Sequence, residues 1–162
     1  FPEAIRGAVR LRDELAPSAK IAVLSNGTRA AVPEVRDALM LVDDNILKLD
    51  TVDADYIALL DRPVGAYDVE RQVEAFASFG GHVIVQTIFL TGSVDGVSVD
   101  NTGEKYVGPW LEALRRIGPE AVTIYTVARE TPVEGLSKAA PEVLDAIAER
   151  VRALGIRCTV SY

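Results

Sequence analysis

Apolar residues follow two spacings along this chain. Some segments repeat apolar positions at helical spacing, as Val69, Val73 and Phe76 do, and others are short apolar runs typical of buried strands. The pattern predicts strands at residues 20–24, 45–49, 82–90, 121–126 and 157–160. It predicts helices at residues 4–15, 33–39, 56–60, 69–77, 107–117 and 143–154, with Pro or Gly at several of their ends.

Two longer polar stretches separate these elements. Residues 91–103 are rich in Gly, Ser, Asp and Asn and are predicted to form a functional or mobile loop, and residues 128–137 contain Pro and Gly. The alternation of strand and helix predicts an α/β fold, in which helices cover a parallel sheet. Because crossover units of this length suit an open sheet and a barrel equally, both architectures stay open.

Composition narrows the function classes. The chain has 162 residues, of which 49% are hydrophobic, and these values favour a single domain over residues 1–162. Its net charge of -7 argues against binding to nucleic acid or an anionic membrane through the electrostatic field of the whole protein. Binding through a local basic groove stays an alternative. Cys158 is the single cysteine, which excludes an internal disulfide and a site built from several thiolates. We find no membrane-length apolar run and no basic leader, so we expect a cytoplasmic protein.

Polar residues gather where the predicted strands end. In parallel α/β folds, ligands bind at the carboxyl ends of the strands, where loops converge and helix N-termini offer backbone donors. We therefore expect one polar rim. Its members are Ser25, Asn26 and Thr28 after the first strand, Lys48 and Asp50 on the second, Gln86 and Thr87 in the third, and Tyr125 and Thr126 on the fourth.

Lys48 and Asp50 are the most informative pair on this rim. Period-2 geometry places both on one face of their strand, while Leu47 and Leu49 point to the other. A lysine in a buried strand needs a partner, because an unpaired buried charge is costly. The pair is either a structural ion pair or a lining of a ligand pocket.

The other rim residues also allow two interpretations. The segment from Ser25 to Thr28 is either an ordinary turn or helix cap, or a set of groups that hydrogen-bond a ribose or carboxylate. Gln86 is either a satisfied polar group of the core or part of a pocket wall.

The remaining reactive side chains are expected to be structural. His82 begins its strand away from the rim, Cys158 is expected to be an inert thiol, and Trp110 has core spacing. We find no nucleophile elbow, phosphate loop, dinucleotide fingerprint or metal-ligand cluster, and no catalytic residue is assigned. The carboxylates expected to be mostly solvated are Asp43, Asp44, Asp53, Asp55 and Asp61.

Several segments, taken in order, resemble one family. The most specific are LSNGT at residues 24–28, KLD at 48–50 and RP at 62–63, and FPEAIRGAVRLRDEL, VIVQTIFLTG and AVTIYTVARETPVEGL accompany them. Together they resemble the later part of a radical S-adenosylmethionine (radical SAM) protein. The pattern is most similar to iron–sulfur oxidoreductases like 4-demethylwyosine synthase, and it covers nearly the whole chain.

The resemblance implies a fold and roles for the rim. The family fold is a partial (β/α)6 barrel that holds a [4Fe-4S] cluster and S-adenosylmethionine at the carboxyl ends of its strands, and strand 20–24 would be the third of six. The implied contacts to S-adenosylmethionine or substrate are Ser25, Asn26 and Thr28 beside the pocket, Lys48 and Asp50 on the next strand, and Gln86 and Tyr125 deeper or nearer the substrate.

The chain departs from the family in its cluster ligands. Relatives hold the cluster through CxxxCxxC and bind the methionine amino group through a Gly-Glu motif, and neither occurs in this sequence. We therefore expect the chain to be a fragment that is inactive alone, with the radical chemistry belonging to a parent enzyme. The open edge of strand 20–24 then favours pairing into a homodimer.

Two other hypotheses remain. The chain is a cluster-free α/β domain that binds a ligand or a partner without catalysis, or it is an unrelated open-sheet enzyme that uses Lys48 and Asp50 as an acid–base pair. The substrate stays open among modified RNA, peptides and small molecules.

Overall fold

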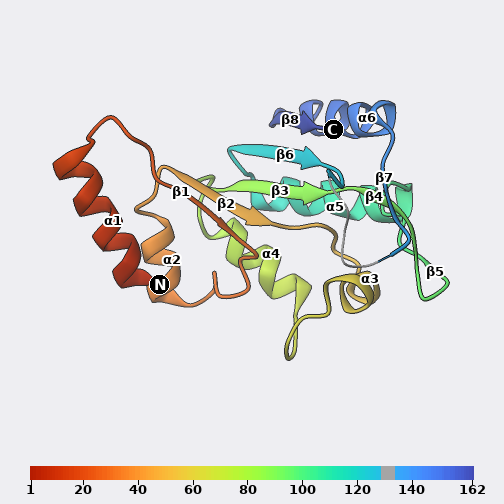
Figure 1. Cartoon of the computed structure of the whole chain (residues 1–162), viewed down its shortest axis with the longest axis horizontal. Coiled ribbons are helices and arrows are strands. Elements are labelled where there is room, and N and C mark those ends of the chain that lie inside the picture. Colours follow the sequence, from red (N-terminus) through yellow and green to blue (C-terminus); the bar gives the residue numbers. More distant parts are fainter. Residues whose placement is uncertain (129–133) are drawn as a thin grey trace.

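A five-stranded parallel sheet forms the centre of the protein. The computed structural model describes residues 1–128 and 134–162. The sheet order is β1-β2-β3-β6-β8, and Figure 1 shows all five arrows pointing toward the same end of the molecule. The predicted α/β fold with a parallel sheet is confirmed. The strands are β1 (Ala22–Ser25), β2 (Asp44–Lys48), β3 (Ile84–Ile88), β6 (Ala121–Tyr125) and β8 (Arg157–Ser161).

Helices cover one face of this sheet. Proline occupies the first turn of three of them, where its missing N–H breaks no helical hydrogen bond. Leu47, Val85 and Val122 of the sheet share one buried cluster with Phe76 and Leu114 of the helices. None of the described helices has the length and apolar character needed to span a membrane. The helices are α1 (Pro2–Leu15), α2 (Pro33–Leu39), α4 (Val69–Ala77), α5 (Glu104–Ile117) and α6 (Pro141–Arg152).

The opposite face of the sheet is more open. Burial alternates along β2, β3 and β6, so that Ile46, Gln86 and Thr123 are half-buried while their neighbours in the chain are buried. Leu24 on the edge strand β1 is 60% exposed. One set of alternating residues therefore builds the core, and the other set lines the open side of the partial barrel.

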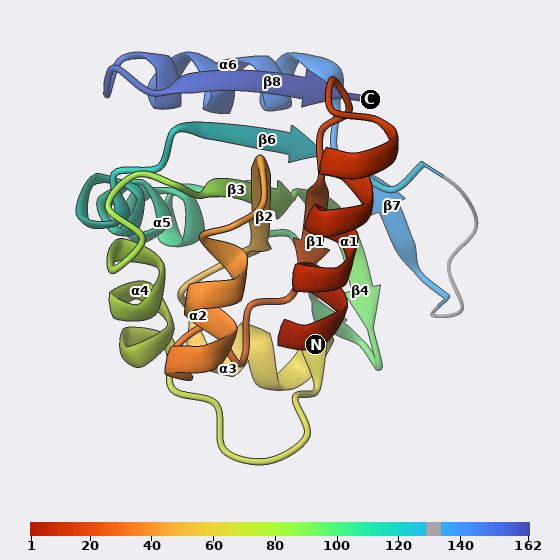
Figure 2. The same cartoon turned by 90° about the vertical axis from the view of Figure 1, so that its left-hand side faces the viewer.

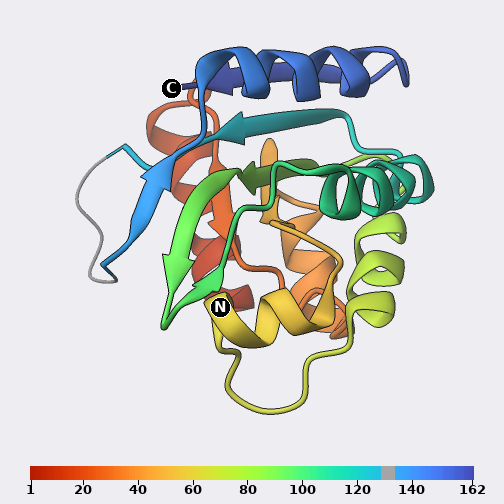
Figure 3. The same ribbon diagram turned by 90° about the vertical axis from the view of Figure 1, so that its right-hand side faces the viewer.

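A small antiparallel sheet lies at the carboxyl end of the main sheet. Its order is β5-β4-β7, with β4 (Leu90–Val94), β5 (Val97–Ser98) and β7 (Leu136–Lys138). Figures 2 and 3 show β4 and β7 side by side beyond the arrowheads of β3 and β6.

This small sheet corrects two predictions. The loop predicted at residues 91–103 is wrong over its first half, because Asp95 and Gly96 adopt positive φ values of 51° and 77° and reverse the chain into a hairpin. The strand predicted at residues 82–90 divides at Phe89 into β3 and β4. Of the stretch 128–137, residues 129–133 lie outside the described residues, and Leu136 begins β7.

A short helical segment follows β2 at the same end. Here α3 (Ala54–Tyr56) continues into the π-helix η1 (Ile57–Asp61), which confirms the helix predicted near residues 56–60. Asp53 caps α3, because its Oδ1 accepts the Tyr56 N–H at 2.9 Å. The segment ends at Arg62, whose positive φ of 46° is uncommon for a residue other than glycine.

Candidate functional site

A polar cleft opens at the carboxyl ends of β1 and β2. Its volume of about 900 Å³ is in the range of small-molecule sites. Three parts of the chain form its walls: the turn after β1, the end of β2, and the segment from η1 to the start of α4. The polar residues that line it are Asn26, Thr28, Arg29, Lys48, Asp50, Thr51, Asp61, Tyr67, Asp68, Arg71 and Gln72.

The turn after β1 is built by its own side chains. Ser25 Oγ accepts the Gly27 N–H at 3.1 Å, and Asn26 Oδ1 accepts the Thr28 N–H at 3.3 Å and its hydroxyl at 3.1 Å. This is the turn chemistry predicted for the segment. Asn26 and Thr28 also line the cleft, whereas Ser25 does not, so the structure gives Ser25 the role of shaping the turn.

Lys48 and Asp50 lie side by side at the floor of the cleft, as the strand geometry predicts. Lys48 Nζ is 3.1 Å from Asp50 Oδ2, and the Asp50 side chain is only 7% exposed. The Ile88 N–H donates to Asp50 Oδ1 at 2.9 Å. Asp50 is therefore satisfied from two sides, while the Lys48 side chain keeps 35% of its surface exposed to the cleft.

The charges of this pair are set by its surroundings. Burial lowers the pKa of Lys48, but Asp50 and Tyr125 raise it more strongly, so that it reaches about 12. Burial raises the pKa of Asp50, and Lys48 and the Ile88 N–H oppose that rise. Lys48 is thus a fixed cation at neutral pH. A pKa so far from neutrality argues against the hypothesis that this pair performs acid–base catalysis.

Residues distant in sequence hold the β2 end in place. Asn101 is fully buried, and its Nδ2 donates to the carbonyls of Ile88 at 2.9 Å and Asp50 at 3.4 Å, while its Oδ1 accepts the Leu90 N–H at 2.9 Å. The sequence prediction missed Asn101, because it falls inside the segment interpreted as a loop. It fixes the backbone from which Asp50 projects.

A second support holds the residue before Asp50. The Leu49 carbonyl accepts hydrogen bonds from Thr87 Oγ1 at 2.9 Å and from Trp110 Nε1 at 3.1 Å. Thr87 and Trp110 are both buried, which confirms the core position predicted for Trp110. Thr87 was predicted on the rim, but its hydroxyl points into this packed layer.

Gln86 and Tyr125 lie beside Lys48 on the open face of the sheet, outside the cleft lining. Gln86 pairs in register with Lys48 across β2 and β3. The Tyr125 ring centroid lies 5.9 Å from Lys48 Nζ. Both residues are half-buried, so the open face continues the polar surface from the cleft toward β6.

Asp61 is exposed, which confirms the solvation expected of it, but its pKa differs from that of an ordinary surface carboxylate. It lines the cleft, where partial burial and repulsion from Asp50 raise its pKa to about 6. The positive charge of Lys48 opposes this rise. Solvent still reaches it across the open mouth of the cleft. The same environment, with burial as the largest cause, raises the pKa of Tyr67 to about 12.

The other four carboxylates lie away from the floor of the cleft. Asp43 is exposed and pairs with Arg12 at 2.8 Å, and Asp55 is also exposed. Asp44 is half-buried, so its expected solvation is only partial. Asp53 is the cap of α3, and its side chain lies 3.5 Å from Lys105.

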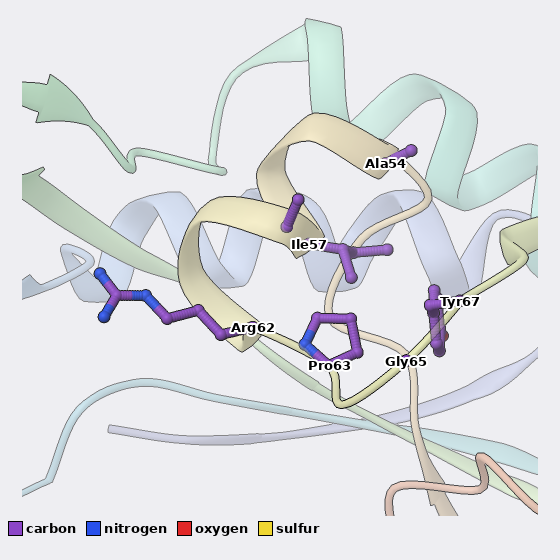
Figure 4. Close-up of a pocket in the computed structure, with 7 residues that line it drawn as sticks. Ala54, Ile57, Arg62, Pro63, Gly65 and Tyr67 are labelled. Carbon is purple, nitrogen blue, oxygen red and sulfur yellow. The ribbon is translucent and has the colours of Figure 1, made fainter.

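A smaller hollow adjoins the cleft. Its volume is about 430 Å³, and its walls include Ile57, Pro63 and Tyr67, which also line the main cleft. Figure 4 shows the Arg62 side chain pointing away from these residues. Most residues around the hollow are apolar or aromatic, and the charged residues of this region other than Arg62 line the main cleft.

The residues present do not fit an iron–sulfur cluster. Cys158 lies on β8, half-buried, and burial raises the pKa of its thiol to about 11, which opposes the thiolate form that a cluster needs. Within residues 1–128 and 134–162, no group of three His, Cys, Asp or Glu side chains could hold a metal ion. His82, the single histidine, precedes β3 at the opposite end of the strand, as predicted.

Comparison with known proteins identifies the fold. Neither a protein-family model nor a curated protein sequence matches this chain. A radical SAM methyltransferase from Sphaerobacter thermophilus aligns with a TM-score of 0.70 and 22% identity, over 99% of this chain and 46% of that one. A domain of pyruvate-formate lyase-activating enzyme from Bacteroides vulgatus aligns at 0.66 and 12% identity, over 99% and 93%.

A third structure gives the same result. SuiB from Streptococcus suis, bound to S-adenosylmethionine, aligns with a TM-score of 0.64 and 10% identity, over 96% of this chain and 36% of that one. The chain thus spans about half of the methyltransferase and about a third of SuiB. At these identities the likeness defines the fold, and it confirms the predicted partial-barrel architecture of radical SAM enzymes.

Proposed function

We propose that this chain is the later part of a radical SAM iron–sulfur oxidoreductase domain, and that its cleft binds S-adenosylmethionine and substrate. The observation that carries this proposal is the Lys48–Asp50 pair at the floor of a polar cleft. The pair stands at the strand ends of a fold shared with radical SAM enzymes. It also belongs to the KLD segment, whose sequence resembles theirs. A single domain over residues 1–162 is part of the proposal.

The charges of the cleft suit S-adenosylmethionine. The ligand carries a carboxylate, an ammonium, a sulfonium and ribose hydroxyls. Lys48 offers a cation for the carboxylate, while Asp50 and Asp61 offer negative charge to the cationic groups. Asn26 and Thr28 supply short polar side chains for the hydroxyls. Because the cleft carries both signs of charge, it suits a ligand that also carries both signs better than it suits an apolar ligand.

The proposed contacts divide between the cleft and the open face. S-adenosylmethionine would contact Asn26, Thr28, Lys48 and Asp50, with Ser25 acting through the shape of the turn. Substrate would extend toward Gln86 and Tyr125 on the open face. The finer likeness to 4-demethylwyosine synthase, a cytoplasmic location and a homodimer formed through the edge strand β1 belong to the same proposal.

The iron–sulfur cluster implied by the family would supply reductive cleavage of S-adenosylmethionine when bound. Its ligands would have to come from residues other than those of this sequence, because Cys158 does not fit the role. The part assigned to this chain is therefore to bind and orient the ligand through the fixed charges of its cleft.

Titration calorimetry with S-adenosylmethionine tests the proposal. We expect the chain to bind it, and Lys48→Met to weaken binding by about tenfold, the value of one charge-assisted hydrogen bond. The matched control is Lys20→Met, because the Lys20 side chain is 74% exposed and its ammonium lies 3.9 Å from Asp44. Equal affinity of Lys48→Met and the unsubstituted chain would refute the proposed contact.

A ligand-binding domain without catalysis is the second candidate. The poor fit of Cys158 to a cluster favours it. Such a domain need not recognise S-adenosylmethionine, so a folded chain that binds none of it in the calorimeter would favour this candidate over the first.

A further inference from the structure

One wall of the cleft is the chain that connects η1 to α4. Its middle part, residues 63–67 with the sequence PVGAY, is apolar or aromatic apart from the glycine, and all of these residues except Gly65 line the cleft. Figures 2 and 3 show this connection as a loop that projects from the molecule between α3 and α4. The segment therefore presents apolar groups both to solvent and to the cleft.

Few interactions hold residues 63–67 in place. Within the part of the chain that the structure describes, no hydrogen bond involves any of them. Val64 is completely exposed, and Gly65 and Ala66 are exposed as well. A segment with few contacts and no hydrogen bonds changes conformation at little cost in free energy. By contrast, the turn after β1 on another wall is held by its own side chains.

The two ends of the segment are fixed. The Arg62 N–H donates to the Ile57 carbonyl at 3.1 Å, and Arg62 has a positive φ of 46°. At the other end, Asp68 Oδ1 accepts the Arg71 N–H at 3.1 Å as the cap of α4. Movement is therefore confined to the residues between Arg62 and Asp68, and a mobile stretch between two fixed ends is the arrangement found in lids.

Empty space lies on two sides of the segment. Pro63 and Tyr67 line the cleft and also the adjoining hollow, whose border Figure 4 shows. A Cβ added at Gly65 would meet no atom within 4 Å. The close packing that fixes residues in protein interiors is missing here. The segment thus has room to move without displacing its neighbours.

We propose that residues 63–67 form a lid, which turns about Arg62 and Asp68 and brings Val64 over a ligand in the cleft. Closure transfers an apolar side chain out of water, which is favourable. It also excludes water from Lys48 and Asp50, so that their charges act more strongly on the ligand. That S-adenosylmethionine is this ligand rests on the proposed function, whereas the lid rests on the exposure and contacts of residues 63–67.

Nitrogen-15 NMR relaxation of the free chain tests the mobility of the lid. We expect order parameters below about 0.6 at the Gly65 and Ala66 amides, and about 0.85 at the Val73 amide in α4. The Thr28 amide is the matched control on the opposite wall, because it is hydrogen-bonded to Asn26 and should be as rigid as Val73. Gly65 and Ala66 amides as rigid as these two would overturn the lid.

Methyl NMR with saturating S-adenosylmethionine tests closure. We expect the Val64 methyl groups to show new nuclear Overhauser contacts with Asn26 or Thr28 on the opposite wall of the cleft. The Val97 methyl groups are the control and should keep their contacts, because Val97 is also exposed but does not line the cleft. Bound S-adenosylmethionine without any new contact of Val64 overturns the lid.

Val64→Ser tests whether closure contributes to affinity. We expect calorimetry to show about fivefold weaker binding of S-adenosylmethionine, because less apolar surface is buried, while Val97→Ser binds as the unsubstituted chain does. Equal affinity of the two variants contradicts the lid. If the folded unsubstituted chain binds no S-adenosylmethionine, the proposed function fails, and the order parameters decide separately: mobile Gly65 and Ala66 amides support the lid, and rigid ones overturn it.

Discussion

Lys48 Nζ lies 3.1 Å from a carboxylate oxygen of Asp50 that is almost completely removed from solvent. The Ile88 N–H satisfies the other oxygen. The arrangement makes Asp50 dependent on donors from two neighbouring strands, β2 and β3. The stability of the strand ends and the charge of the cleft are thus coupled through one side chain.

Replacing Lys48 should destabilise the fold by leaving Asp50 buried without its cation. We expect Lys48→Met to cost about 2 kcal/mol of unfolding free energy at pH 7, less than a fully buried pair because Lys48 is partly exposed. Urea denaturation measures this. Adding Asp50→Asn should recover part of the loss, and a double variant that is merely additive would contradict the coupling.

Asn101 should be more important for stability than its position in a polar segment suggests. Asn101→Ala removes hydrogen bonds to Leu90, Ile88 and Asp50, and we expect a loss of about 3 kcal/mol because buried backbone groups are left unpaired. Faster hydrogen exchange at the Leu90 amide should accompany it. Asn26→Ala, at an exposed turn, is the control, and an equal cost for both variants would argue against the network.

Gly27 and Gly65 provide a matched pair for testing the packing of the turn. Both have positive φ, but a Cβ at Gly27 would collide with Phe76, whereas a Cβ at Gly65 would meet open space. We expect Gly65→Ala to cost about 1 kcal/mol from backbone strain alone, and Gly27→Ala about 3 kcal/mol from strain and overpacking. Thermal unfolding of the two variants makes the comparison, and similar melting temperatures would exclude the collision.

Asp61 should make stability fall as pH rises. Its pKa is about 6 in the folded chain against 3.8 for an unperturbed group, so between these values the folded state binds more protons than the unfolded state. This contribution is present below about pH 4 and is lost as pH rises through about 6. Asp61→Asn removes it, so the variant should gain stability relative to the unsubstituted chain between pH 4 and pH 7.

Urea denaturation at pH 4 and at pH 7 measures the stability of Asp61→Asn relative to the unsubstituted chain. The matched control is Asp55→Asn, an exposed position on α3 that does not line the cleft. A relative stability of Asp61→Asn that is the same at pH 4 and pH 7 would show that Asp61 titrates as an ordinary surface carboxylate.

Local patterns were enough to predict the sheet and half of the cleft. The α/β class followed from apolar strands separated by amphipathic helices, and the contact of Lys48 with Asp50 followed from the period of a strand. Asn26 and Thr28 meet these residues because the carboxyl ends of neighbouring parallel strands share one edge. Each of these features depends on geometry within a few residues or on a general rule of the fold.

The missed features depend on contacts between distant segments. Asn101 donates a hydrogen bond to the Asp50 carbonyl, 51 positions away in the chain, and its local sequence does not predict that contact. The raised pKa of Asp61 comes from the groups that surround it in the folded chain, with burial first and Asp50 second. The hairpin was predictable in part, since Asp95 and Gly96 form a common turn dipeptide between valines.

The alternation of burial along β2, β3 and β6 separates two kinds of mutational constraint on the same strands. Positions such as Leu47, Val85 and Val122 are limited by the packing of the helices. Positions such as Ile46, Gln86 and Thr123 on the open side are only half-buried, so packing limits them less. The side chains at every second residue of a strand can therefore change while the intervening residues keep the fold.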